Sequence, residues 1–487
     1  MTSPAQRQEL ALAVAAAVLL VAVRSFVPLA YEQVYFDSDQ AIVGLMAKHL
    51  SELRAFPLFF YGQNYMLGVQ AWIAAPFVWL GGPTVTMIRL PLLIVNATVP
   101  SLLILMMSRL GVRPALAFVA ALPLIVTTPV MSMALYATLG ASVEPFLYVL
   151  GLWWLRRRPL AFGALLCLGT LHREFTILTL PALAFVHLIE RRPVRWPAVA
   201  RGAAGFAATW LAIDVLKLGL HAGSLTQEAQ TIGGWLSSDV SGYLARFRSL
   251  VTAGVPVLFG GRAMSLDHYG INSTIGAGSS VAGVALAAAT GLSLVRLVRL
   301  TRDAGGRERL SRGSFFLYLG AVALATIAVY GLNGRIDPIR IPLVRYVLFG
   351  LLLPVAIFGA WSLAESSRAW LIGVTALIAL WAAFTLRDNV LLIREYGSRP
   401  PANEFRMLAD YLVAHRIQYG YATYWDAYIV DFLSGEQVIL TTNDVIRVVE
   451  YDTRVRAHDQ EAVTIEREPC TVGTRLAAWC IDDPLKR

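Results

Sequence analysis

Long apolar stretches recur along most of this chain, and short polar connections separate them. A membrane-spanning helix needs about 20 mostly apolar residues to cross the hydrocarbon layer of a bilayer. We predict eleven spans, several of them short, at residues approximately 11–30, 87–108, 114–130, 142–155, 160–172, 175–189, 197–215, 273–295, 314–332, 343–364 and 369–386. Only 15% of the 487 residues are charged, against about 25% in ordinary soluble chains. The sequence therefore predicts a mainly α, polytopic membrane protein, and it disfavours a soluble enzyme or a disordered chain.

Basic residues gather in alternate connections between the predicted spans. With the N-terminus in the cytoplasm, the inner connections contain Arg109 and Arg113, Arg156 to Arg158, the arginines between 191 and 201, and the run from Arg296 to Arg312. This distribution follows the positive-inside rule. The net charge of +9 therefore indicates an orientation in the lipid bilayer, and it does not indicate a nucleic-acid partner.

Two apolar segments need a separate interpretation. The first stretch ends at Ala30 with no clear small-x-small cleavage site, so we interpret it as an uncleaved first span. Residues 67–81 are also apolar, but a crossing there would put Arg156 to Arg158 outside. We therefore expect residues 67–81 to lie along the outer interface, where Trp72 and Trp79 suit the headgroup region.

An odd number of spans places the C-terminal tail outside the cytoplasm. We divide the chain into a transmembrane domain, residues 1–387, whose first outer loop is 31–86, and an extracytoplasmic domain, residues 388–487. Residues 403–416 have apolar positions at helical spacing, while YGYATYW and QVILTT are typical of short strands. This tail is expected to be a small α/β domain, and outside the cytoplasm its Cys470 and Cys480 are a plausible disulfide pair.

Two aspartates, Asp37 and Asp39, stand at the start of a predicted helix in the first outer loop. Ile42, Leu45, Met46, Leu50 and Leu53 follow at helical spacing, so we expect an amphipathic helix on the outer leaflet. The aspartates fit a catalytic role, but they also fit helix capping, because Asp37 with Gln40 three residues later is an N-cap arrangement.

Further ionisable residues occur at the same predicted face of the membrane. Glu144 begins a span, and His172, Arg173 and Glu174 interrupt an apolar stretch. Ionisable groups at membrane depth are costly unless they are paired or face a wet cavity, so they are functional candidates. The alternatives are a local ion pair between Arg173 and Glu174, and an interfacial His172 that is satisfied by its neighbours.

The segment NGRIDPIRIPLVRY places several cations on the predicted outer face, namely Arg335, Arg340 and Arg345, beside Asp337 and Tyr346. Arginine has a planar fork of donors that suits phosphate oxygens. Lipid headgroups or pairing with Asp337 are the alternatives. Together, a carboxylate base, phosphate-binding arginines and a membrane-embedded body suit the transfer of a sugar from a lipid phosphate.

The segments FDSDQAIVGLMAKHL and FFYGQNYMLGVQAW resemble the first outer loop of bacterial C-type (GT-C) glycosyltransferases, which are related to the protein O-mannosyltransferases and the lipid A aminoarabinose transferases. The likeness continues in IRLPLLI, in VRYVLFGLLLP and in YATYWDAYIVDFLSGEQVIL. It implies an inverting glycosyltransferase with a polyprenyl-phosphate-linked sugar donor and a glycan, lipid or protein acceptor. Such an enzyme would act at the outer face of a bacterial cytoplasmic membrane.

The same resemblance implies roles for individual residues. Asp39 corresponds to the catalytic base, Glu144 to an acid that faces the same cavity, and Arg345 with Tyr346 to a pair near the lipid phosphate. This chain has Gln40 where the family usually has Glu, which leaves Asp37 as a candidate substitute. The aromatic loop motif of the family is matched by Tyr61, Gln63 and Tyr65. These residues either contact the substrate or pack within the loop.

Metal dependence stays open at this point. The carboxylates of Asp37, Asp39 and Glu144 suit Mg²⁺ or Mn²⁺, and Asp39 and Glu144 are the expected ligands if the reaction depends on a metal. A transporter or lipid flippase that uses the same charges is the main alternative function, although no internal duplication supports it. A non-catalytic sensor with a ligand-binding C-terminal domain is a third interpretation.

Overall fold

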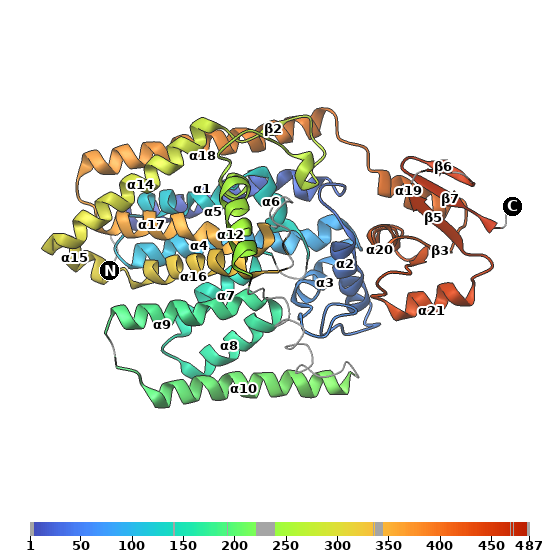
Figure 1. Cartoon of the computed structure of the whole chain (residues 1–487), viewed down its shortest axis with the longest axis horizontal. Coiled ribbons are helices and arrows are strands. Elements are labelled where there is room, and N and C mark those ends of the chain that lie inside the picture. Colours follow the sequence, from blue (N-terminus) through green and yellow to red (C-terminus); the bar gives the residue numbers. More distant parts are fainter. Residues whose placement is uncertain are drawn as a thin grey trace.

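The computed structural model describes residues 4–139, 142–191, 193–220, 239–334, 336, 344–467, 469–470 and 472–484. It consists of an elongated helical bundle with a small α/β domain at one end (Figure 1). The helices of the bundle are α1 (Pro4–Ala30), α4 (Val85–Arg109), α5 (Pro114–Ile125), α6 (Pro129–Tyr136), α7 (Glu144–Leu155), α8 (Pro159–His172), α9 (Thr179–Ile189), α10 (Trp196–Gly219), α14 (Ser280–Arg302), α16 (Ser314–Leu332), α17 (Leu352–Ala364) and α18 (Arg368–Ser398).

Every predicted span contains a helix of the structure, which confirms the polytopic, mainly α fold. Within the described residues, six helices are long and apolar enough to cross a membrane alone: α1, α4, α10, α14, α16 and α18. The expected span 114–130 is instead broken, since α5 and α6 meet at 80°. Proline explains the break, because Pro129 has no N–H to continue the first helix and instead begins α6.

Two further boundaries differ from the sequence prediction. The span expected from residue 273 begins only at Ser280, because residues before it form the short strand β2 (Gly276–Ala277), which pairs with β1 (Met264–Ser265). Helix α18 was expected to end near 386 but continues to Ser398, so it carries the chain beyond the bundle toward the α/β domain (Figure 1).

The N-terminus lies at one end of the bundle together with the predicted cytoplasmic connections. The Glu9 carboxylate accepts a hydrogen bond of 3.1 Å from the N–H of Ala115, and Arg296 forms an ion pair of 2.7 Å with Glu365. Figure 1 shows the N-terminus and α15 (Ala304–Ser311) at this end, and the α/β domain at the other. Successive helices of the bundle therefore run back and forth between its two ends (Figure 1).

The first outer loop forms two helices at the end of the bundle that faces the α/β domain: α2 (Ser38–Ser51) and α3 (Val69–Gly81). We expected α2 to lie on the outer leaflet, but Ile42, Leu45 and Met46 are fully buried in protein. Helix α2 packs against α3 on one side and against α20 (Tyr424–Leu433) of the α/β domain on another. Protein thus covers the apolar face that was assigned to lipid.

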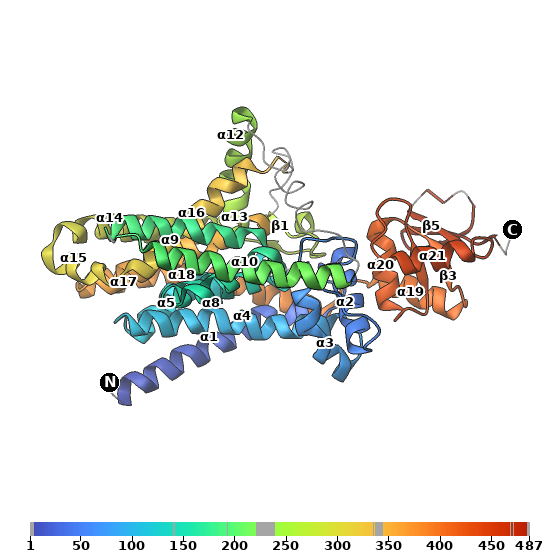
Figure 2. The same ribbon diagram turned by 90° about the horizontal axis from the view of Figure 1, so that it is seen from below.

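A further segment connects α10 with α14. It contains α12 (Val240–Ser249), η2 (Leu250–Gly254), α13 (Val255–Phe259) and η3 (Asp267–Tyr269). In Figure 2, α12 projects away from the bundle to one side. Its side chains Val240 and Leu244 are 70% and 60% exposed. This apolar face suits the hydrocarbon or interfacial region of a bilayer.

The α/β domain contains a five-stranded sheet of order β4-β3-β5-β7-β6, in which β3 is parallel to β4 and β5, and β7 is antiparallel to β5 and β6. The strands are β3 (Tyr419–Tyr421), β4 (Ile439–Thr441), β5 (Val463–Arg467), β6 (Thr474–Leu476) and β7 (Trp479–Asp482), with helices α19 (Glu404–Ala414), α20 and α21 (Val449–Ala457). The segment YGYATYW is a strand only in its first part, because α20 begins at Tyr424.

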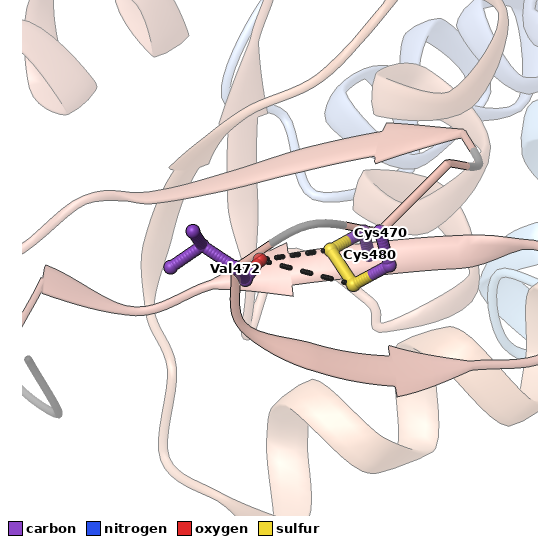
Figure 3. The surroundings of a disulfide bond; sticks show 3 residues. All are labelled: Cys470, Val472 and Cys480. Atoms are coloured by element: carbon purple, nitrogen blue, oxygen red, sulfur yellow. Dashed lines mark hydrogen bonds between the residues drawn. A yellow bond between two sulfur atoms is a disulfide. The ribbon is translucent and has the colours of Figure 1, made fainter.

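A disulfide joins Cys470 to Cys480, with the two Cα atoms 5.0 Å apart, as Figure 3 shows. Cys480 lies on β7, so the bridge fastens the preceding segment to the edge region of the sheet. Cys167 is a free, buried cysteine.

Candidate functional site

The segment between α1 and α2 is held by one buried arginine, Arg89 on α4. Its Nη1 donates to the carbonyl of Pro28 (2.8 Å), and its Nη2 donates to the carbonyl of Val34 (2.9 Å) and to Oε1 of Gln40 (3.2 Å). Arg89 is only 1% exposed, so these bonds compensate its burial. The IRLPLLI motif therefore has a structural explanation: its arginine fixes the backbone that carries the two aspartates.

Asp37 is the N-cap of α2, as its spacing predicted. Its carboxylate accepts a hydrogen bond of 3.0 Å from the N–H of Gln40. Burial and the nearby Asp39 raise the pKa of Asp37 to about 6, although the bond from Gln40 and the charge of Arg345 oppose this rise. Asp37 thus has a capping role, and it is also one of two acids that lie close to Arg345.

Asp39 lies one residue inside α2, and its partner comes from the α/β domain. The hydroxyl of Tyr424 donates a hydrogen bond to Oδ1 of Asp39. Within the described residues, Oδ2 of Asp39 makes no hydrogen bond. Sequence reasoning missed Tyr424, although it belongs to the YATYWDAYIVDFL segment that carries part of the family resemblance.

A pocket lies between the start of α7 and the segments that precede α9 and α17. Its empty volume is about 230 Å³, including the part that is open to solvent, and its lining residues are Ser142, Pro145, Arg173, Phe175, Arg345, Leu348 and Phe349. The structure therefore brings Arg173 and Arg345, which are far apart in the sequence, to one pocket. Asp37 and Asp39 are close enough to Arg345 to interact with it electrostatically.

Aromatic rings position the two guanidinium groups. The guanidinium carbon of Arg173 is 5.2 Å from the ring centre of Phe175 and 5.7 Å from that of Tyr346. That of Arg345 is 5.1 Å from the Tyr346 ring, and Tyr346 packs edge-on against Phe175. Within the described residues, Arg345 has no carboxylate within ion-pair distance, and its Nε is buried without a hydrogen-bond partner. Two cations at one pocket favour an anion between them.

Glu144 begins α7 beside this pocket and is 5% exposed. Its carboxylate accepts a hydrogen bond of 2.9 Å from the N–H of Ser142. Gln70 of α3 donates to the Ser142 hydroxyl at 3.2 Å, so the first outer loop also contacts this corner. Glu144 therefore adjoins the pocket through Ser142 and Pro145, which both line it.

Other candidate residues have mainly structural contacts. His172 is fully buried, and its Nδ1 lies 3.0 Å from the hydroxyl of Tyr148. The Nε of Arg173 lies 4.0 Å from Oε2 of Glu174, which fits the local ion pair considered above. Tyr61 bonds His49 at 2.7 Å, at the end of α2 opposite to Asp39. Its contacts fit packing of the loop.

Gln63 and Tyr65 are partly buried in the same loop as Tyr61. Arg335, Asp337 and Arg340 lie outside the described residues. Of that cluster, the structure therefore describes only Arg345 and Tyr346, which lie in η4 (Val344–Tyr346) before η5 (Leu348–Leu351) and α17.

Asp39 and Glu144 are the expected ligands if the reaction depends on a metal ion. Among the described residues, no three His, Cys, Asp or Glu side chains come together so that they could hold a metal. Asp39 is bonded to Tyr424 and Glu144 to the backbone, so this pair alone does not complete a site for Mg²⁺ or Mn²⁺. We therefore derive no chemical step through a metal.

Solved structures share this fold over nearly the whole chain. ArnT from Cupriavidus metallidurans in the apo state matches 97% of this chain with 97% of its own, at 12% identity and a TM-score of 0.61. ArnT bound to undecaprenyl phosphate matches 96% of this chain with 97% of its own, at 12% identity and a TM-score of 0.62. The oligosaccharyltransferase AglB from Archaeoglobus fulgidus, in complex with an inhibitory peptide and a dolichol-phosphate, matches 96% of this chain with 70% of its own, at 11% identity and a TM-score of 0.53.

No protein-family model and no curated protein matches the sequence. The structural likeness confirms the predicted fold: the chain is a multi-pass membrane protein with the GT-C fold and a small C-terminal α/β domain.

Proposed function

We propose that this protein transfers a sugar from a polyprenyl-phosphate-linked donor to a hydroxyl group of a glycan, lipid or protein acceptor. The observation that carries the proposal is the pocket lined by Arg173 and Arg345, because Arg345 also interacts electrostatically with Asp37 and Asp39. The fold adds support, because similar structures were solved with undecaprenyl phosphate or dolichol-phosphate bound.

In this mechanism Asp39 is the general base. Its Oδ1 is held by Tyr424, and Oδ2 is left to accept the proton of the acceptor hydroxyl as that oxygen attacks the anomeric carbon. Attack from the face opposite to the phosphate inverts the configuration. Asp37 is less suited to this role, because its carboxylate caps α2 and accepts the N–H of Gln40.

Arg345 and Arg173 bind the phosphate and stabilise the charge that develops on it as the bond to the sugar breaks. A phosphate is a good leaving group, so no strong general acid is required. Glu144 adjoins the pocket on the α7 side, where its carboxylate accepts the N–H of the lining residue Ser142 and helps to hold that segment in place.

The proposed location is the outer face of a bacterial cytoplasmic membrane, with the N-terminus in the cytoplasm. The arginine-rich connections lie at the end of the bundle opposite to the α/β domain, in agreement with the positive-inside rule. The Cys470–Cys480 disulfide in the α/β domain also supports an oxidising compartment on that side.

The test uses purified protein with a panel of polyprenyl-phosphate sugars, with and without a chelator. Asp39→Asn is expected to lower kcat by about 10²–10⁴-fold, the usual contribution of a general base, while binding of undecaprenyl phosphate is retained. Arg345→Ala is expected to weaken that binding about tenfold or more, since a charge-assisted hydrogen bond is lost.

Asp37→Asn is the matched control, because asparagine caps a helix as well as aspartate does and the substitution removes only the charge. If Asp39→Asn turns over as fast as the wild type, the assigned base is wrong. If Asp37→Asn alone abolishes transfer, Asp37 is the base. A protein that moves lipid between compartments but never forms a glycosidic bond would support the transporter instead.

A further inference from the structure

The α/β domain contacts the site through the first residue of one helix. Tyr424 begins α20 and is 7% exposed. Two neighbouring residues of α2 bond to it: the hydroxyl of Ser38 donates to the Tyr424 carbonyl, and the Tyr424 hydroxyl donates to Asp39. The N-termini of α2 and α20 are therefore joined by both backbone and side chain.

The ring of Tyr424 is held on several sides. Trp425 lies edge-on at 5.0 Å between ring centres, and Tyr428 at 5.5 Å. The guanidinium carbon of Arg447 is 5.7 Å from the Tyr424 ring and equally far from that of Phe60. Arg447 also donates to the carbonyl of Gly62 in the first outer loop (3.1 Å). A side chain packed in this way has little rotamer freedom, so its hydroxyl points in one direction.

From these contacts we propose that Tyr424 is a positioning residue, through which the α/β domain fixes the carboxylate of Asp39 for proton abstraction. The idea rests on the proposed glycosyl transfer. Free rotation about the carboxylate bond would present either oxygen in many directions. A hydrogen bond to Oδ1 selects one orientation and aims Oδ2 at the acceptor side. The α/β domain is thus part of the active site and not an appended module.

The first experiment compares Tyr424→Phe with Tyr421→Phe in the full-length protein. Tyr421 is a matched control, because its hydroxyl also donates to an aspartate, Asp459, but at an exposed site of the same domain (2.6 Å). Tyr424→Phe is expected to lower kcat about 10- to 100-fold with the donor KM unchanged, because orientation of the base is lost while donor binding is kept. Tyr421→Phe is expected to behave as the wild type.

A double variant separates positioning from simple loss of structure. If Tyr424 acts through Asp39, then Tyr424→Phe should have no further effect on residual transfer in the Asp39→Asn protein. Multiplication of the two separate losses would show that Tyr424 acts independently of Asp39 and would overturn the proposal.

Hydrogen exchange provides a readout that does not require turnover. Tyr424→Phe is expected to speed exchange of the amides in the first turn of α2 about tenfold, because this turn opens more often when a contact that holds it is lost. Tyr421→Phe is expected to leave the exchange of these amides unchanged. Unchanged exchange at α2 in Tyr424→Phe refutes the positioning role, whether or not the protein transfers sugar. Faster exchange in a protein that shows no transfer with any donor would contradict the proposed function and leave the contact between the domains intact.

Discussion

Gly44 in the middle of α2 packs tightly against α20 of the α/β domain. A Cβ atom at Gly44 would lie 2.5 Å from Cε2 of Phe432 on α20, and 2.8 Å from both Cδ2 and Cζ of the same ring. Real carbon contacts are about 3.5–4.0 Å, so Gly44→Ala requires a relative shift of about 1 Å. Phe432 is fully buried and cannot swing away freely.

The expected cost follows from two opposing effects. Overpacking of a filled core costs about 1–3 kcal/mol, whereas Gly→Ala inside a helix gains about 0.8–1 kcal/mol. Gly397→Ala is the control, because Gly397 is helical and a Cβ there meets no atom within 4 Å. Both variants gain the stabilisation that alanine gives over glycine in a helix. The free energy of unfolding of Gly44→Ala should therefore lie about 1–3 kcal/mol below that of Gly397→Ala.

Thermal unfolding of the purified variants measures this difference, and transfer kinetics measure its consequence. Gly44 lies five residues from Asp39, so a shift of about 1 Å between α2 and α20 would break the hydrogen bond from Tyr424. We therefore expect kcat to fall in Gly44→Ala but not in Gly397→Ala. Replacing Phe432 by Leu in the Gly44→Ala protein should restore part of both losses. Equal stability of the two alanine variants would refute the close approach of α20 to α2.

Two other predictions concern the α/β domain. Glu436 accepts hydrogen bonds from Lys48, Arg54, His49 and Tyr451, and so joins the domain to the far end of α2. Glu436→Gln should lower stability by about 1.5–3 kcal/mol in thermal unfolding, because the charge-assisted hydrogen bonds from the partly buried Lys48 and the exposed Arg54 are weakened. Burial raises the pKa of Asp431 well above its usual value, so the folded state binds a proton more tightly than the unfolded state. The free energy of unfolding should therefore fall as the pH rises above about 4. Asp431→Asn should reduce this dependence on pH, while the Oδ1 atom of the asparagine still accepts the N–H of Leu440.

The sequence predicted the helices of the bundle well, because a helix that crosses a bilayer needs a long uninterrupted stretch of apolar residues and few other structures do. It failed where protein replaces lipid as the apolar partner. Helix α2 has apolar residues at helical spacing, and the sequence alone does not distinguish a leaflet from α20 as the surface that covers them. The break between α5 and α6 depended on two prolines within one apolar run, which hydropathy does not detect.

The site itself was predicted only in part, and the reason lies in distance along the chain. Asp39 and Arg345 carried local signals, because charges in apolar surroundings are conspicuous. Tyr424 carried none, since a tyrosine at the start of a helix in an α/β domain is ordinary, and its role arises only when α20 docks on α2. Tyr61 belonged to a more specific motif than Tyr424 did, yet the structure places it with His49.

Gln40 makes hydrogen bonds that a glutamate at this position would not all make. Its Nε2 donates to the carbonyl of Tyr35, while its Oε1 accepts both from Arg89 and from the N–H of Thr138. A glutamate could accept from Arg89 and Thr138, but its ionised carboxylate would oppose the Tyr35 carbonyl with a second oxygen. The amide thus holds the turn that presents Asp39, and negative charge next to Arg345 comes from Asp37 and Asp39 instead. The proposed mechanism therefore has its proton acceptor and the neighbouring charge without an acid at position 40.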